Sequence, residues 1–219
     1  MARLRSAAPG MAIERAAAEA GSLVAGIDEV GKGAWAGPLT VAVVVAGQGR
    51  LTGVRDSKVL SPARRAALVP RIGAWARASA IGEASPGECD RLGMSEAQRL
   101  ATRRALDALP VAPDEVLVDG KWDFVGGART LVAGERHSIS IAAASVLAKE
   151  HRDAMMRALG DALPWYDFGA NKGYPSPAHR AALCSVGPST QHRVSWGWVE
   201  DLPWHRPGPD PQPVLPGMG

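Results

Sequence analysis

The sequence predicts one α/β domain with a mixed β-sheet, and three observations support this fold class. Two strand-like apolar segments, residues 22–28 and 38–46, follow one another closely. Two helix-like segments come next, and a third strand is expected at 115–118. A long helix at 142–159 completes the pattern. Strands and helices in this order are typical of a sheet that is covered by helices.

The first two strands differ in character. Residues 22–28 alternate apolar and small residues toward an acidic end, whereas 38–46 are β-branched and nearly continuous, as in a buried central strand. Residues 29–37 contain three glycines and predict a tight turn between them. The third strand, 115–118, ends at Asp119.

Helix starts are marked by caps. Ser61 followed by Pro62 predicts a helix to about residue 77. Ser95 and Gln98 have the spacing of a capping box and predict a helix to residue 109. We expect the arginines of the first of these helices to form a solvated face; they are Arg64, Arg65, Arg71 and Arg77.

Composition excludes several classes of protein. The 219 residues are 46% hydrophobic and 21% charged, which excludes collagen, coiled coil and extensive disorder. The longest apolar stretch, 40–46, is far shorter than the ~20 residues of a membrane span. A net charge of +3 permits a polyanionic partner. Cys89 and Cys184 form no paired motif, and we expect a cytoplasmic protein.

The two ends differ from the domain at 22–200. Residues 1–21 are rich in alanine, but charged residues interrupt any signal-peptide core, so we expect a flexible arm. Translation could start at Met1 or Met11. Residues 201–219 contain six prolines and no periodicity, and we expect them to be disordered.

Carboxylates stand at the strand ends, at Asp28, Glu29 and Asp119. Active sites of α/β folds gather at such ends. Cleavage of a phosphodiester by two divalent metals needs several carboxylates that converge on the ions. Neighbours on a strand point to opposite faces, so Asp28 and Glu29 share a site only if the strand ends or twists between them.

A nucleotide triphosphatase is the rival interpretation, because residues 26–33 nearly fit a phosphate-binding loop. Gly33 replaces the hydroxyl residue of that loop, and Asp28 and Glu29 would place negative charge where phosphates bind. A β-branched run follows instead of a helix, so we reject this interpretation.

Several motifs of the chain resemble those of a known family. Residues 26–45 (GIDEVGKGAWAGPLTVAVVV) are similar to the opening motif of bacterial ribonuclease HII. The match runs in order from about Leu23 to Val199, and its later motifs are Asp56-Ser57-Lys58 with Leu60-Ser61, Val118-Asp119-Gly120, Ser140 to Asp153, Lys172-Gly173-Tyr174, Gly187-Pro188 and His192-Arg193.

The resemblance implies a ribonuclease-H-like fold with a mixed central sheet, flanking helices and a C-terminal helical extension. It implies a site for Mn²⁺ or Mg²⁺ on four acids: Asp28, Glu29, Asp119 and Asp153. Ser145, Lys149 and Asp153 follow at i, i+4 spacing on one side of a helix.

The implied activity is hydrolysis of the RNA strand of RNA–DNA hybrids, on the 5′ side of ribonucleotides, including single ones embedded in duplex DNA. Such an enzyme acts in ribonucleotide removal and primer clearance and must sense the 2′-hydroxyl. The substrate-binding residues that the resemblance implies are Gly31, Lys32, Gly33, Lys58, Ser145, Lys149, Lys172 and Tyr174.

The chain departs from the family pattern at the turn. Lys32 stands where Arg is usual, so the charge is kept but the planar fork is lost. Ala34-Trp35 replaces Pro-Leu, and Asn171 stands where His is common. We expect Trp35 to pack at the turn, and His179 or His192 to be a phosphate neighbour or a structural group.

Two alternatives stay open. One is a non-catalytic protein that binds RNA–DNA hybrids, although a binding module gains nothing from four acids near phosphates. The other is a ribonuclease HIII-like enzyme without single-ribonucleotide activity; it usually carries an extra N-terminal domain, for which an arm of about 21 residues is too short. We expect a monomer, with a replication-clamp contact through the tail as an open possibility.

Overall fold

The computed structural model describes residues 8–55 and 57–203. Its centre is a five-stranded sheet in the order β3-β2-β1-β4-β5. β1 pairs antiparallel with β2 and parallel with β4, which confirms a mixed sheet. The strands are β1 (Val24–Val30), β2 (Leu39–Val45), β3 (Ala78–Ala84), β4 (Glu115–Asp119) and β5 (Arg129–Leu131).

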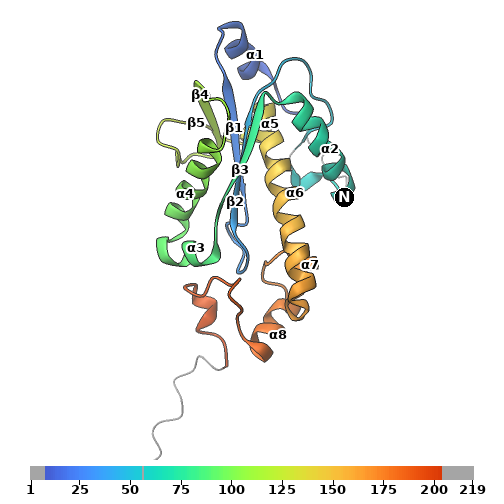
Figure 1. The fold of residues 1–219 in the computed structure, drawn as a ribbon, viewed down its shortest axis with the longest axis vertical. Coiled ribbons are helices and arrows are strands. Elements are labelled where there is room, and N and C mark those ends of the chain that lie inside the picture. Colours follow the sequence, from blue (N-terminus) through green and yellow to red (C-terminus); the bar gives the residue numbers. More distant parts are fainter. Residues whose placement is uncertain (1–7, 56, 204–219) are drawn as a thin grey trace, which may run out of the picture.

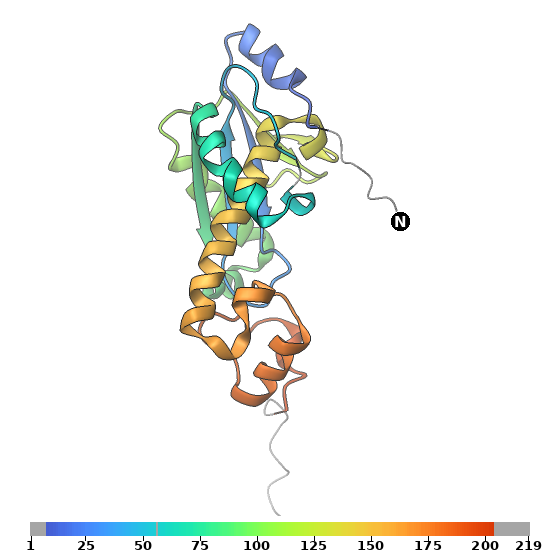
Figure 2. The same ribbon diagram turned by 90° about the vertical axis from the view of Figure 1, so that its right-hand side faces the viewer.

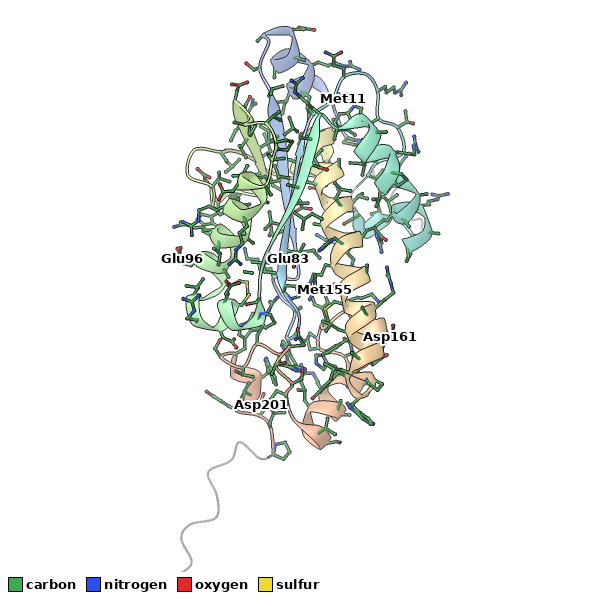
Figure 3. The ribbon with its side chains drawn as sticks, in the orientation of Figure 1. Met11, Glu83, Glu96, Met155, Asp161 and Asp201 are labelled. Atoms are coloured by element: carbon green, nitrogen blue, oxygen red, sulfur yellow. The ribbon has the colours of Figure 1, made fainter. Side chains whose placement is uncertain are left out.

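Helices cover both faces of the sheet (Figure 1). On one face lie α3 (Pro86–Leu92) and α4 (Met94–Asp107), and on the other lie α2 (Pro62–Trp75) and α6 (Ile139–Ala162). Side chains fill the space between the sheet and the helices on either side (Figure 3). The predicted α/β architecture with flanking helices is therefore confirmed.

β2 is the buried central strand that its β-branched run predicts. All seven of its residues are buried. Val41, Val43 and Val45 pack in the core with α4, whereas Ala42 and Val44 pack in the core with α2 and α6. The alternation follows from the pleat, which turns successive side chains to opposite faces.

α6 lies close against β1 because Gly26 has no side chain. A Cβ on Gly26 would lie 2.2 Å from the backbone nitrogen of Ile141. Further along the same helix, Arg152 lies beside Gly31, where a Cβ would lie 2.3 Å from Nε of Arg152. The helix therefore runs alongside β1 and on to the turn that follows it.

Part of the segment that we expected to be a flexible arm is a docked helix, α1 (Ala12–Glu19). Glu14 is buried in its first turn, and its Oε1 accepts hydrogen bonds from the hydroxyls of Ser138 and Ser140 and from the Ser140 amide. No local pattern predicts these partners, because they lie more than 120 residues away.

The chain after α6 forms the predicted helical extension at one end of the sheet (Figure 2). It contains α7 (Phe168–Asn171), α8 (Pro177–Val186) and three-residue 3₁₀ turns, one of them at Gly197–Val199. Trp198 belongs to this turn, and it stacks on Trp35 at 4.9 Å between ring centroids. Trp35 therefore packs at the turn, as expected.

Three further expectations need correction. α4 begins at Met94 after Gly93, which has no side-chain cap, so Ser95 and Gln98 form no capping box. A capping box does occur at Ser85, at the start of α3, a helix that the sequence analysis missed. Arg65 is buried rather than solvated.

Of residues 201–219, which were expected to be disordered, 204–219 lie outside the described residues, but Leu202 is buried in the core of the C-terminal extension. Within the described part of the chain, no helix is both long and apolar enough to cross a membrane.

Candidate active site

Asp28 of β1 and Asp119 of β4 occupy corresponding positions on two neighbouring parallel strands. The register pairs Ile27 with Val118, so the next residue on each strand is a carboxylate. Their electrostatic coupling places the two carboxyl groups near one another, and Glu29 is coupled to Asp119 as well. The structure therefore brings together the three acids that the strand ends predicted.

Asp28 and Glu29 lie on opposite faces of β1, which continues to Val30 instead of ending between them. Asp28 is on the α6 face, where its carboxyl group bonds the Ser145 hydroxyl. Glu29 is on the α4 face, and the charge that acts on it most strongly is that of Lys32. The backbone amide of Glu29 donates to Oδ1 of Asp28 at 2.9 Å. The two acids thus flank the strand at the same edge of the sheet.

The electrostatics of this edge favour protonated carboxyl groups. Burial, with the charge of Glu29 as the second cause, raises the pKa of Asp28 from 3.8 to about 7. Burial also raises the pKa of Glu29, against which the charge of Lys32 acts. Crowded carboxylates of this kind are typical of functional sites.

The donor set fits a hard divalent cation by its chemistry. Carboxylate oxygens are the ligands that Mg²⁺ and Mn²⁺ prefer, and a cation would relieve the repulsion that raises the pKa of Asp28. Among residues 8–55 and 57–203, no three acidic, histidine or cysteine side chains already surround one point. Binding of a cation would therefore require rotation of these side chains.

Asp119 is fixed by the segment that follows β5. Its Oδ1 accepts the amide of Gly134 at 2.7 Å, at the start of the short helix α5 (Gly134–His137). Glu135 is the next residue along the chain. It is not among the acids that the sequence predicted. It follows the end of a strand parallel to β4, so the strand-end rule would have found it if β5 had been predicted.

Asp153 does not lie with these acids. Its Oδ1 accepts from Nζ of Lys149 at 2.6 Å, and its Oδ2 lies 3.4 Å from Nη2 of Arg65. Ser145, which bonds Asp28, is two helical turns earlier, about 12 Å along the axis. Asp153 is therefore part of an ion-pair network between α6 and α2, which also includes Glu150 at 2.8 Å from Nε of Arg65.

The glycine turn contributes differently at its three positions. Gly31 has φ +91° and faces Arg152, so its missing side chain serves packing. Nothing lies within 4 Å of the place where a Cβ on Gly33 would stand, so the backbone there is open. Lys32 is exposed, and its Nζ donates to Gln98 at 2.9 Å and lies 5.4 Å from the centroid of the half-exposed Trp122 ring.

The remaining candidate substrate residues lie on both sides of the acids. Ser57 and Ser145 share a buried hydrogen bond of 2.8 Å, which joins the 3₁₀ turn Ser57–Val59 to α6. Lys58 is exposed on that turn and lowers the pKa of Glu29, although less than Lys32 does. Lys149 is engaged by Asp153.

Lys172 and Tyr174 lie on the segment after α7, which contacts the glycine turn directly. The carbonyl of Gly173 accepts the amides of Trp35 and Ala36 at 2.8 and 3.2 Å. Lys172 has a left-handed backbone with φ +54°, and its Nζ donates to the Gly169 carbonyl. Asn171 holds the same segment through the Gly173 amide.

His179 and His192 are structural. Both are buried, and their Nε2 atoms lie 2.9 Å apart. Nδ1 of His179 bonds the carbonyl of Tyr174, and Nδ1 of His192 bonds the amide of Ser189. Burial lowers the pKa of both rings, to about 4 for His192.

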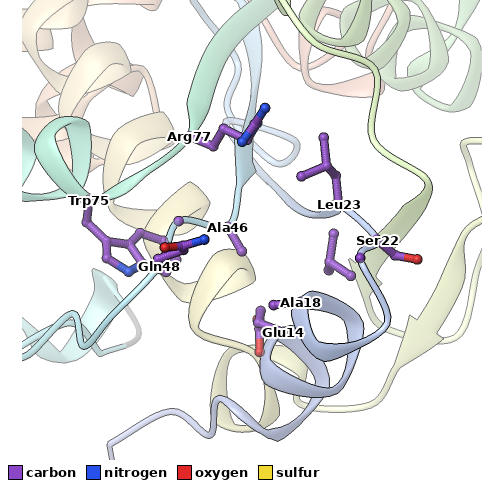
Figure 4. A pocket seen from close by; sticks show the side chains of 11 residues that line it. Glu14, Ala18, Ser22, Leu23, Ala46, Gln48, Trp75 and Arg77 are labelled. Atoms are coloured by element: carbon purple, nitrogen blue, oxygen red, sulfur yellow. The ribbon is translucent and has the colours of Figure 1, made fainter.

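A cavity of about 390 Å³ lies away from the acids, beside the amino end of β1. Figure 4 shows Glu14 and Ala18 of α1 on one side of it and Gln48 and Trp75 on another. Asp28 and Glu29 lie near the carboxyl end of β1, so this cavity does not belong to the candidate site.

Comparison with known proteins identifies the family. The family model described as ribonuclease HII matches residues 25–199. The chain belongs to the ribonuclease HII family. It is 54% identical over 187 residues to the ribonuclease HII of Streptomyces griseus, covering 82% of this chain and 79% of the relative. It is 43% identical over 190 residues to that of Thermus thermophilus, covering 85% and 92%.

Solved structures of ribonucleases H have a similar fold. The ribonuclease H2 of Pyrococcus horikoshii OT3 matches with a TM-score of 0.68 and 25% identity, covering 82% of this chain and 96% of that one. The ribonuclease HII in a complex with PCNA from Archaeoglobus fulgidus matches with a TM-score of 0.66 and 27% identity, covering 80% and 95%. As a member of the ribonuclease HII family, the chain is an endoribonuclease of RNA–DNA hybrids.

Proposed function

We propose that the chain cleaves the RNA strand of RNA–DNA hybrids, and single ribonucleotides embedded in duplex DNA, by a two-metal mechanism. Mn²⁺ or Mg²⁺ would be held by Asp28, Glu29 and Asp119, with Glu135 as the fourth acid in place of Asp153. The observation that carries this proposal is the register that sets Asp28 beside Asp119, together with the raised pKa of Asp28.

The chain's own groups act on the substrate in two ways. The acids would hold the divalent ions beside the scissile phosphate, and the ions would supply activation of water and stabilisation of the leaving 3′ oxygen. The open backbone at Gly33 accommodates the ribose with its 2′-hydroxyl, and Tyr174 packs on the neighbouring deoxyribose. Cleavage then falls on the 5′ side of the ribonucleotide and leaves a 5′ phosphate.

Positive charge near the acids supports binding of the phosphate backbone. Lys58 is exposed beside the acids, and Lys32 is exposed at the turn. Such contacts position a nucleic acid without reading its sequence. Because Lys32 is already docked on Gln98 and Trp122, recognition at the turn rests on the backbone rather than on this side chain.

Asp28→Asn separates a nuclease from a hybrid-binding protein. The variant keeps the shape of the side chain but loses the charge, so we expect cleavage of a labelled RNA–DNA hybrid to fall by at least about 10²-fold while hybrid binding stays within about threefold. Asp161→Asn, at an exposed position at the end of α6, is the matched control and should cleave normally. Unchanged cleavage by Asp28→Asn would contradict the proposal.

A sliding-clamp contact is a second part of the proposal. It is supported by the structural relative that was solved in a complex with PCNA. We place the contact in residues 204–219, and the enzyme is proposed to act as a monomer in the removal of ribonucleotides and primers. A chain that ends at residue 203 should lose affinity for the clamp in surface plasmon resonance and keep its cleavage rate. Unchanged affinity would place the contact elsewhere.

A further inference from the structure

Arg152 is a buried cation whose hydrogen bonds go to backbone carbonyls. Its side chain is fully buried. Nε donates to Pro38 at 3.0 Å, Nη2 to Ala36 at 2.9 Å and Nη1 to Lys172 at 2.8 Å. Burial of a charge is unfavourable unless such bonds compensate for the lost water. A buried guanidinium at this position therefore depends on these three hydrogen bonds.

The neighbouring acid does not neutralise this cation by an ion pair. Both oxygens of Asp153 are engaged by Lys149 and Arg65. Adjacent residues on a helix point about 100° apart, so Asp153 turns toward α2 while Arg152 turns toward the glycine turn. The two residues therefore serve different contacts.

The three carbonyls belong to two segments that both reach the proposed substrate site. Ala36 and Pro38 end the glycine turn, and Lys172 precedes Tyr174 by two residues. Cζ of Arg152 also lies 5.6 Å from the centroid of the Tyr174 ring, within the range of a cation–π contact. One side chain thus joins the turn, the Lys172 backbone and the Tyr174 ring.

The backbone at both segments needs such support. Lys172 has φ +54°, a left-handed conformation that is unfavourable for a residue with a side chain. Gly173 follows with φ +79° and lies so close to the turn that a Cβ would stand 2.3 Å from the Ala36 carbonyl oxygen. A planar fork can hold several carbonyls at fixed angles, which the single ammonium of Lys cannot do.

We propose that Arg152 is a positioning residue that fixes the Tyr174 ring against the glycine turn and thereby supports selection of a single embedded ribonucleotide. This inference rests on the proposed function. In an embedded site the sugar next to the ribonucleotide is a deoxyribose, on which Tyr174 packs. In a uniform hybrid every sugar of the cleaved strand is a ribose, so loss of this positioning should affect the embedded site more.

A double-mutant cycle tests the link between the two side chains. kcat/KM is measured for wild type, Arg152→Lys, Tyr174→Ala and the double variant, on a duplex with one ribonucleotide and on a uniform hybrid. We expect Arg152→Lys to lower kcat/KM about tenfold more for the duplex with one ribonucleotide than for the uniform hybrid. This extra loss should disappear in the Tyr174→Ala background. If Arg152 had a merely structural role, Arg152→Lys would lower kcat/KM equally for both substrates, and its effect would add to that of Tyr174→Ala.

Arg193→Lys is the matched control. Arg193 is as fully buried as Arg152, but it bonds the carbonyls of Lys32 and Gly37 and lies over Trp196 instead of Tyr174. The loss of kcat/KM that Arg193→Lys causes should be the same in the wild-type and in the Tyr174→Ala backgrounds. Equal coupling for Arg193 and Arg152, or none for Arg152, would overturn the proposal. Failure of the wild type to cut the embedded site would instead overturn the proposed function.

A second measurement needs no variant of Arg152. The chain has only two tyrosines, so ¹⁹F NMR of protein labelled with 3-fluorotyrosine gives two signals, and Tyr174→Phe identifies that of Tyr174. Because the ring is fixed before substrate binds, we expect a signal that is shifted from that of free fluorotyrosine in the substrate-free enzyme. A signal at the position of the free amino acid would overturn the proposal even if Arg152→Lys did not fold.

Discussion

Arg65 joins two helices by pairing its guanidinium with two carboxylates of α6. Its Nε lies 2.8 Å from Glu150 and its Nη2 lies 3.4 Å from Asp153, and Nη1 donates to the carbonyls of Ser57 and Leu60. The side chains of Arg65, Glu150 and Asp153 are all buried or nearly buried. The contact fixes the turn that carries Lys58 relative to α6.

Arg65→Met should therefore destabilise the protein by about 3 kcal/mol, because it removes the ion-pair partner of Glu150 and one of the two partners of Asp153. Arg64→Met, at the exposed neighbouring position, should change the free energy of unfolding by less than about 0.5 kcal/mol. Urea denaturation of both variants measures the difference. Equal effects would mean that the Arg65 network is not stabilising.

Part of the site is predictable at the scale of single residues. Asp28, Glu29 and Asp119 can be found because strand ends are visible in the sequence. Asp153 could not be placed, since i, i+4 spacing shows that Ser145, Lys149 and Asp153 share a side of a helix but not how far each lies from the strand end. Arg65 was misjudged because a helix pattern does not reveal a buried carboxylate on another helix.

α1 and the start of α6 are joined by a buried carboxylate. α1 is held by Glu14, whose Oε1 is shared by Ser138 and Ser140. These hydroxyls come at the start of α6, where Ser138 also caps the helix by accepting the amide of Ile141. Docking of α1 and capping of α6 are therefore coupled.

Glu14→Ala should lower the free energy of unfolding by about 1–3 kcal/mol, because buried donors of Ser138 and Ser140 lose their acceptor. The control is Glu19→Ala on the same helix, where the side chain is exposed and little change is expected. Chemical denaturation measures both. If the two variants are alike, α1 is not held by this carboxylate.

The C-terminal extension carries a dependence on pH. Burial lowers the pKa of His192 from 6.5 in the unfolded chain to about 4 in the fold. The folded state therefore binds the proton less well, so the stability from this group is present above pH 6.5 and is lost as the pH falls toward 4. The full difference is on the order of 3 kcal/mol.

His192→Gln should therefore show a smaller loss of stability between pH 7 and pH 4.5 than the wild type, although it is less stable at pH 7. The exposed His137→Gln serves as the control and should follow the wild-type slope. Thermal unfolding at several pH values measures this. A slope unchanged by His192→Gln would show that the ring is not held neutral.

Elements differ in how well their sequence defines them. β2 could be predicted because a nearly continuous β-branched run is typical of a strand that is buried on both faces. β3 was missed, since its sequence ASAIGEA has one β-branched residue, and it is a strand because it pairs with β2 along seven residues. β5 has only three residues, too few for any pattern.

At the scale of the whole molecule, the sheet and the extension form one site. The glycine turn leaves the carboxyl end of β1 and is bonded by segments more than 130 residues away: the Gly173 carbonyl, the Gln191 carbonyl and the Arg193 side chain. α6 runs alongside the sheet into the extension (Figure 2). Its Ser145 lies at Asp28 and its Arg152 lies at the turn. A sequence pattern can predict α6 but not these distant contacts.

The most direct test is cleavage of an end-labelled DNA duplex with one embedded ribonucleotide, in the presence of Mg²⁺ or Mn²⁺. All-DNA duplex and RNA–DNA hybrid serve as controls. We expect one cut on the 5′ side of the ribonucleotide and none in all-DNA. Cleavage of the hybrid alone would show an enzyme without single-ribonucleotide activity, and no cleavage with either metal would contradict the assignment of Asp28, Glu29 and Asp119 as the catalytic acids.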